Sequence, residues 1–266
     1  LDYYLELSKK ESDYLLYEEP LGTVSGVQTQ IPVLLSEYQF QSKEDVDAYL
    51  ELMKTTPDYF NSLIAFEQEK AQKGLFMASY TADTVIEQCQ AFIDMGDSNY
   101  LISTFVDRIQ KLTDLSESEK SDYIQKNAYM LQTYVLPAYQ QLIKTVVELK
   151  DSGKNEEGLC YLPNGKEYYE LTVQASTGSA RTVPQLQKLT KNQMKDDLAA
   201  MKAVIGLTAE QAKETAVMES TDPKEILNSL SLDIQKTFPK LPQTSVEVKY
   251  VPKAMEAHLS PAFYMI

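Results

Sequence analysis

The sequence predicts a mainly α-helical protein: one multi-helix domain with a small β element near the C-terminus. Nine glycines and 11 prolines in 266 residues are few for a turn-rich β fold. Apolar residues recur at spacings of three and four over much of the chain, which is typical of amphipathic helices. We expect residues 1–266 to form one helical domain or a fragment of a larger one. The alternative is a division into 1–150, which is helical, and 151–266, which adds short strands.

Capping signals mark several helix starts in the first part of the chain. Ser42 precedes an acidic first turn, and Ser116 with Glu119 forms a capping box. Thr56 stands before a proline that suits the first helical position, and Thr81 opens a helix that carries Cys89. Further such signals occur at Thr208 with Gln211 and at Asp222–Pro223.

The longest helical pattern runs from about 116 to 150. Its apolar residues form one stripe, and an unbroken helix of this length would span roughly 50 Å. Pro137 lies inside the pattern and lacks the N–H that a helix interior needs. We therefore predict a kink or a division of the helix there.

The second part of the chain changes from helix to strand. We expect a loop at 151–158, a short helix carrying Tyr168 and Tyr169, and a helix from about 182–184 to Gly206. Apolar and polar residues then alternate over 244–250, which predicts a strand. The apolar run 260–266 has no polar tail, so we expect it to pack against chain beyond Ile266.

Charge and hydropathy exclude several classes of partner. The formal net charge of −14 repels phosphate backbones and anionic lipid headgroups, so we expect no nucleic-acid binding. No apolar run approaches the roughly 20 residues of a transmembrane helix. No signal peptide is visible, and the first residue is not Met. These ends suggest a processed or trimmed chain.

The residues that could hold a metal are too few for a catalytic zinc site. His258 is the only histidine, whereas a His-Glu-x-x-His helix needs two. Cys89 falls on an apolar helix face and Cys160 in a loop. We therefore expect no metal or other cofactor within this chain.

Other catalytic arrangements are no better supported. A Gly-x-Ser-x-Gly elbow and the glycine-rich phosphate loops are absent. Acidic pairs occur at 18–19, 156–157 and 196–197. Neighbouring acids on a helix point in different directions, so a glycosidase pair is a weaker reading than solvated surface.

Several stretches, in this order, resemble the uncharacterised bacterial family called domain of unknown function 885. They are Tyr134–Tyr139, Leu159–Tyr169, Ser176–Ser179, Val248–Pro252 and Leu259–Tyr264. The resemblance covers about Leu21 to Ile266. It implies a large, mainly helical protein related to zinc metallopeptidases of the gluzincin type, often exported or lipid-anchored in the cell envelope. The family's zinc motif lies C-terminal to the last stretch, so no zinc ligand is carried onto this chain.

Two functions follow as hypotheses. In the first, the chain is the non-catalytic helical wall, with part of the substrate cleft, of a zinc metallopeptidase-like protein. Its partners are then a peptide substrate and the rest of the parent beyond Ile266, which would hold the zinc. The second is a non-catalytic peptide- or glycan-binding or scaffold module of the cell envelope. The cleft candidates, each with packing as the alternative role, are Tyr168, Tyr169, Arg181, Tyr250 and Tyr264.

Overall fold

The computed structural model describes residues 2–154, 157–205, 220–239, 248 and 250. Among these, the residues up to Ser179 form one compact unit and those from Ala180 onward form a second. The division predicted near residue 150 stays a prediction. The strand predicted at 244–250 lies almost wholly outside the described residues, as do His258 and Tyr264.

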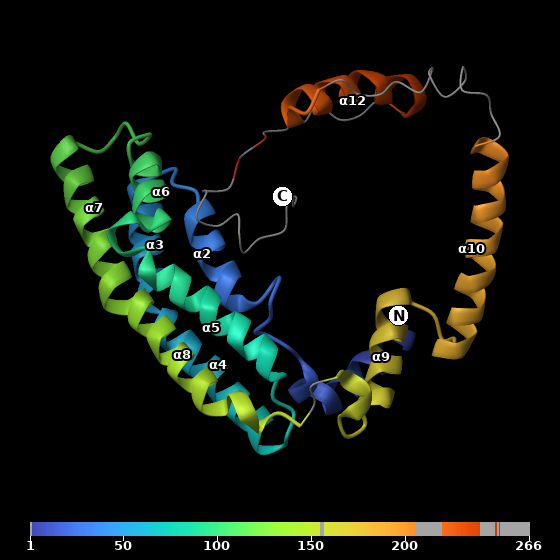
Figure 1. Ribbon diagram of the computed structural model, residues 1–266. Coiled ribbons are helices and arrows are strands. Elements are labelled where there is room, and N and C mark those ends of the chain that lie inside the picture. Colours follow the sequence, from blue (N-terminus) through green and yellow to red (C-terminus); the bar gives the residue numbers. More distant parts are fainter. Residues whose placement is uncertain (1, 155–156, 206–219, 240–247, 249, 251–266) are drawn as a thin grey trace. The chain divides into compact units, whose positions relative to one another are not determined.

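Helices make up the regular structure of both units, so the mainly α prediction is confirmed (Figure 1). Within the described ranges, no helix is both long enough and apolar enough to cross a bilayer. The first unit contains α1 (Asp2–Glu11), η1 (Ser12–Tyr17), α2 (Val27–Glu37), α3 (Lys43–Lys54), α4 (Thr56–Gln72), α5 (Ser79–Asp94), η2 (Gly96–Ser98), α6 (Tyr100–Ile109), α7 (Glu117–Met130), η3 (Leu131–Val135), α8 (Leu136–Leu149), η4 (Lys150–Ser152), η5 (Leu159–Tyr161) and α9 (Gly165–Thr177). The second contains α10 (Val183–Ile205) and α12 (Pro223–Thr237).

The capping signals locate helix starts to within two residues. Ser42 and Ser116 both form capping boxes, and the Asp222 side chain accepts from the Lys224 N–H. The prediction at Thr56 is off by one residue, because Thr55 is the N-cap and Thr56 is buried. Helix α5 begins at Ser79, before Thr81, and its N-cap Ala78 makes no side-chain bond. The signal at Thr208 lies outside the described residues.

The long helical segment is interrupted close to Pro137 but does not end there, so the predicted division into two separate helices is not seen and a kink stays a prediction. Between α7 and α8 lies one wider, π-type turn, η3, in which the Leu136 N–H bonds to the Leu131 carbonyl five residues earlier. Pro137 then falls in the first turn of α8, where its missing N–H costs least. A π turn adds one residue to the helix without ending it.

Helix α8 lies between α4 and α5 in the core of the first unit, while α7 packs against α3 and α6 (Figure 1). Aromatic side chains fill this core. The Tyr139 ring lies 4.9 Å from that of Phe60 and 4.6 Å from that of Phe92, and its hydroxyl donates to the Gln28 carbonyl at 2.7 Å. Cys89 is buried there, which confirms its predicted packing role, and burial raises the pKa of its thiol to about 12.

Helix α10 in the second unit has apolar side chains along it that no other described residue buries. About half of each of these side chains is exposed: Leu189, Met194, Leu198 and Met201. In α12, Leu227, Leu230 and Leu232 are likewise exposed.

Candidate functional site

Three tyrosines meet where η1 lies beside α9. The Tyr14 and Tyr168 rings are stacked with their centroids 5.5 Å apart, and the Tyr17 ring lies 4.9 Å from that of Tyr168. Tyr17 is buried, while Tyr14 and Tyr168 are half-buried. Part of the cluster therefore faces solvent.

The local chain course at the start of α9 positions Tyr168. Asn164 adopts a left-handed conformation with φ of 52°, and Gly165 follows as the first residue of α9. A Cβ on Gly165 would lie 1.7 Å from the Leu159 carbonyl oxygen, so only glycine fits this junction. The Tyr17 hydroxyl donates to the Pro163 carbonyl and ties the same loop to η1.

Acidic groups surround the exposed side of this tyrosine cluster. The Tyr168 hydroxyl lies 3.4 Å from Oε1 of Glu18, an exposed residue. Burial and then the charge of Glu18 raise the pKa of Tyr168. Burial, Tyr14 and Glu167 raise the pKa of Tyr17. Both phenols are protonated at neutral pH, and their hydroxyl hydrogens are donated within the chain, to the Pro163 carbonyl and to Glu18. We call Tyr14, Tyr17, Glu18 and Tyr168 the tyrosine–Glu18 site.

A buried lysine fixes the chain beneath the site. Lys70, near the end of α4, is fully buried and its Nζ donates to the Glu18 carbonyl at 2.6 Å. The same Nζ lies 3.1 Å from Oε2 of Glu19 and 3.9 Å from Oε2 of Glu67. Residues 18 and 19 are therefore held to α4 through one ammonium group.

The tyrosine–Glu18 site combines aromatic faces and a carboxylate. Aromatic faces and a carboxylate attract cations, and tyrosines give large contact areas at small entropic cost. In the parts of the chain that the structure describes, no three His, Cys, Asp or Glu residues are grouped so as to hold a metal. The arrangement is suited to binding a peptide or an amine.

Of the five predicted cleft residues, only Tyr168 lies in this site. Tyr169 follows it on α9 and is 48% exposed. Arg181 and Tyr250 belong to the second unit, where Tyr250 is 70% exposed. Tyr264 lies outside the described residues. Cleft roles for all five residues, Tyr168 included, stay predictions.

Sequence reasoning missed Tyr14, Tyr17 and Lys70. The spacing of Tyr14 and Tyr17, with Glu18 directly after them, was the available signal for an aromatic and acidic surface. Lys70 carried no such signal, because Glu67 and Lys70 are spaced like an ordinary exposed ion pair on a helix.

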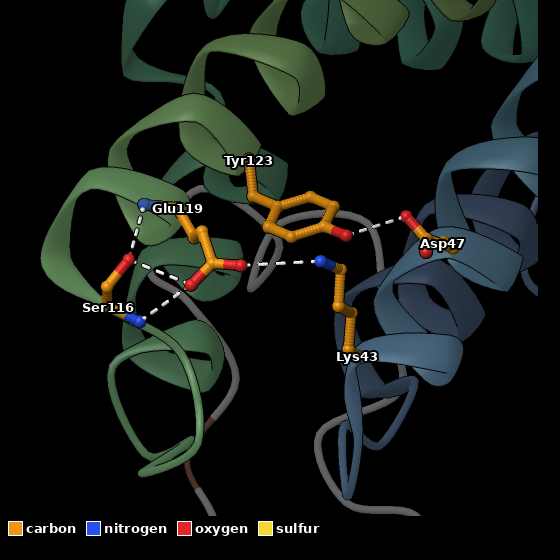
Figure 2. A network of polar contacts seen from close by, with 5 residues as sticks. All are labelled: Lys43, Asp47, Ser116, Glu119 and Tyr123. Atoms are coloured by element: carbon orange, nitrogen blue, oxygen red, sulfur yellow. Dashed lines mark hydrogen bonds and ion pairs between the residues drawn. The ribbon is translucent and has the colours of Figure 1, made fainter.

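A second polar network joins the N-terminal ends of α3 and α7 (Figure 2). Glu119 accepts from the Ser116 N–H at 3.0 Å and from Lys43 Nζ at 3.3 Å, and the Ser116 bond is the main reason that its pKa falls to about 2. The Tyr123 hydroxyl donates to Oδ1 of Asp47 at 2.8 Å. Capping and helix pairing account for these contacts, so we assign them a structural role.

The fold and this site define a mainly helical protein with a partly exposed aromatic and acidic surface. The chain belongs to the family described as "Bacterial protein of unknown function (DUF885)", whose model matches residues 1–266. No curated protein matches it.

One solved structure similar to the chain is the crystal structure of "the putative lipoprotein from Colwellia psychrerythraea". The two share 16% sequence identity with a TM-score of 0.70. The match covers 91% of this chain and 45% of the other, so the chain spans less than half the length of that protein. At this identity the likeness shows the fold alone.

Proposed function

We propose that this chain is the non-catalytic helical wall, with part of the substrate cleft, of a zinc metallopeptidase-like protein of the bacterial envelope. The tyrosine–Glu18 site carries the proposal, because it offers a peptide aromatic faces and a negative charge together. Membership of the family is consistent with it. The name of the similar structure, a lipoprotein, supports an envelope location.

In this proposal the chain binds the peptide substrate, and the rest of the parent protein catalyses its hydrolysis. Tyr14 and Tyr168 contact the peptide through their ring faces, and Glu18 attracts its amino terminus or a basic side chain. Zinc and its ligands come from the parent beyond Ile266, where zinc would activate a water molecule for peptide hydrolysis. None of the residues in the tyrosine–Glu18 site takes part in bond breaking.

Metal analysis and peptide hydrolysis by the full-length parent test this proposal. We expect about one zinc per molecule and loss of hydrolysis on treatment with a chelator, restored by added zinc. A metal-free parent without peptidase activity would refute the metallopeptidase part.

Substitution separates the role of the site from that of the metal. In the active parent, Tyr168→Ala should raise KM for a peptide with a free amino terminus and leave kcat largely unchanged, because the residue contributes only binding. Tyr80→Ala is the matched control, since Tyr80 is 63% exposed and lies on α5. Equal KM values for the two variants would remove the tyrosine–Glu18 site from the proposal.

The second candidate is a non-catalytic module that binds peptides or glycans. The tyrosine–Glu18 site favours it to the same degree, because the site needs no metal to bind. This function predicts that the 266-residue chain binds a cationic peptide in excess chelator and that the parent never hydrolyses it. Hydrolysis by the zinc-loaded parent would exclude it.

A further inference from the structure

The environment of Lys70 is unusual because one buried cation faces two carboxylates. We call Glu19, Glu67 and Lys70 the Lys70 cluster. The side chains of Lys70 and Glu67 are 0% and 1% exposed, whereas that of Glu19 is 47% exposed. If both carboxylates were ionised, one ammonium group would face two negative charges, and the charge on Glu67 would be fully buried, which is costly.

The distances show which carboxylate pairs with the lysine. Glu19 lies 3.1 Å from Nζ, within hydrogen-bonding reach, while Glu67 lies 3.9 Å away. Neither oxygen of Glu67 has a hydrogen-bond partner. A buried carboxylate without hydrogen bonds is much less stable than a neutral carboxyl group in the same place. Glu19 is therefore the counter-ion of Lys70, and Glu67 is the group that burial neutralises.

The groups around the cluster agree with this assignment. The pKa of Glu67 is raised to about 7, mainly by burial; the charge of Lys70 opposes this rise and the charge of Glu19 adds to it. Glu18, in the segment after η1, contacts the cluster in two ways. Its carbonyl accepts a hydrogen bond from Lys70, and its negative charge raises the pKa of Glu19. Tyr168 of α9 contacts Glu18.

We propose that Glu67 carries a proton in the folded protein. Release of this proton as the pH rises through neutrality loosens the attachment of residues 18–19 to α4. An ionised Glu67 competes with Glu19 and the Glu18 carbonyl for the single ammonium group. The Lys70 cluster is thus a pH-sensitive contact directly beneath the tyrosine–Glu18 site. This inference does not depend on the proposed function.

The sign of the effect follows from linkage. The pKa of Glu67 is higher in the folded than in the unfolded chain, so the unfolded state releases its proton first and stability falls as the pH rises. With values of about 7 and about 4.5, the unfolding constant should increase about 30-fold more between pH 5.5 and pH 8.5 than it would without this group.

Urea unfolding of the protein and of two variants at these two pH values tests the proposal. Glu67→Gln keeps a neutral side chain of the same size and should remove the 30-fold increment, leaving the variant at least as stable as the original at pH 8.5. Glu69→Gln is the matched control on α4, where Glu69 is 55% exposed, and should keep the increment. A Glu67→Gln variant with an unchanged increment, or one that is less stable than the original at pH 8.5, would overturn the proposal.

A second measurement does not depend on the Glu67 variant folding. In the original protein, with Glu19 in place as the counter-ion of Lys70, the infrared spectrum at pH 6 should show a protonated carboxyl band that disappears by pH 8.5, because ordinary carboxyl groups are already ionised at pH 6. Amide exchange of residues 14–19, corrected for pH, should accelerate over the same interval. Absence of the band at pH 6 would contradict the proposal, as would exchange that stays constant.

Discussion

Arg108, one of two arginines in the chain, joins the end of α2 to α6 and permits a sharp test of the packing. Its Nη1 donates to the carbonyls of Leu35 and Tyr38 at 3.0 and 2.6 Å, and its Nε to the Thr104 carbonyl at 3.0 Å. The guanidinium also lies over two rings, 4.5 Å from the centroid of Phe40 and 5.0 Å from that of Tyr49. One planar cation therefore satisfies carbonyls at the C-terminal end of α2 and covers an aromatic pair.

Replacing Arg108 should cost more than the loss of an ordinary surface charge. A hydrogen bond from a charged group contributes about 1.5–3 kcal/mol, and a cation over a ring adds about 0.5–1 kcal/mol. These contributions are not additive, so we expect Arg108→Ala to lower the free energy of unfolding by about 3 kcal/mol. Arg108→Lys should lose about 2 kcal/mol, because an ammonium cannot reproduce the planar fork.

Urea unfolding followed by far-ultraviolet circular dichroism measures both values. Lys111→Ala, an exposed cation just beyond α6, is the control and should change stability by less than about 0.5 kcal/mol. The reasoning fails if Arg108→Lys is as stable as the original protein, because charge alone would then explain the contact. It fails equally if Arg108→Ala and Lys111→Ala have the same stability.

Two further predictions concern the junctions of the fold. Gly165→Ala should destabilise the first unit by about 2 kcal/mol, because its Cβ would strike the Leu159 carbonyl, whereas Gly22→Ala meets no atom within 4 Å and should be close to neutral in urea unfolding. Ser116→Ala should cost about 1 kcal/mol through loss of the α7 cap. Lys43→Ala should leave the urea midpoint almost unchanged because its ion pair with Glu119 is exposed, and equal losses for these two variants would show that the cap is not the important contact.

Local signals in the sequence predicted the helices well. The caps at Ser42 and Ser116 and the interruption of the α-helical pattern near Pro137 depend on neighbours within five residues, so a single sequence contains the information. The predicted starts of α4 and α5 are less accurate, because the N-cap residues Thr55 and Ala78 make no side-chain capping bond that the sequence could signal. Thr56, which resembles a cap, is buried instead.

The candidate site was harder to predict, because long-range contacts build it. Tyr168 was selected, but its partners Tyr14 and Tyr17 lie about 150 residues earlier and belong to a short 3₁₀ segment with weak periodicity. Glu67 and Lys70 look like a solvent-exposed pair until the packing of η1 on α4 buries them. Burial of this kind arises from the tertiary arrangement and leaves no pattern in nearby residues.

The π turn between α7 and α8 allows one continuous helical segment to pack against two different sets of helices. The additional residue rotates the part of the helix that follows it, so the buried side chains of α7, which are Lys120, Tyr123 and Asn127, face α3 and α6 while the mostly apolar buried side chains of α8 face α4 and α5. Pro137 follows this turn directly and has no N–H to donate to a regular α-helical hydrogen bond, so the change of pattern falls where the sequence already lacks a donor.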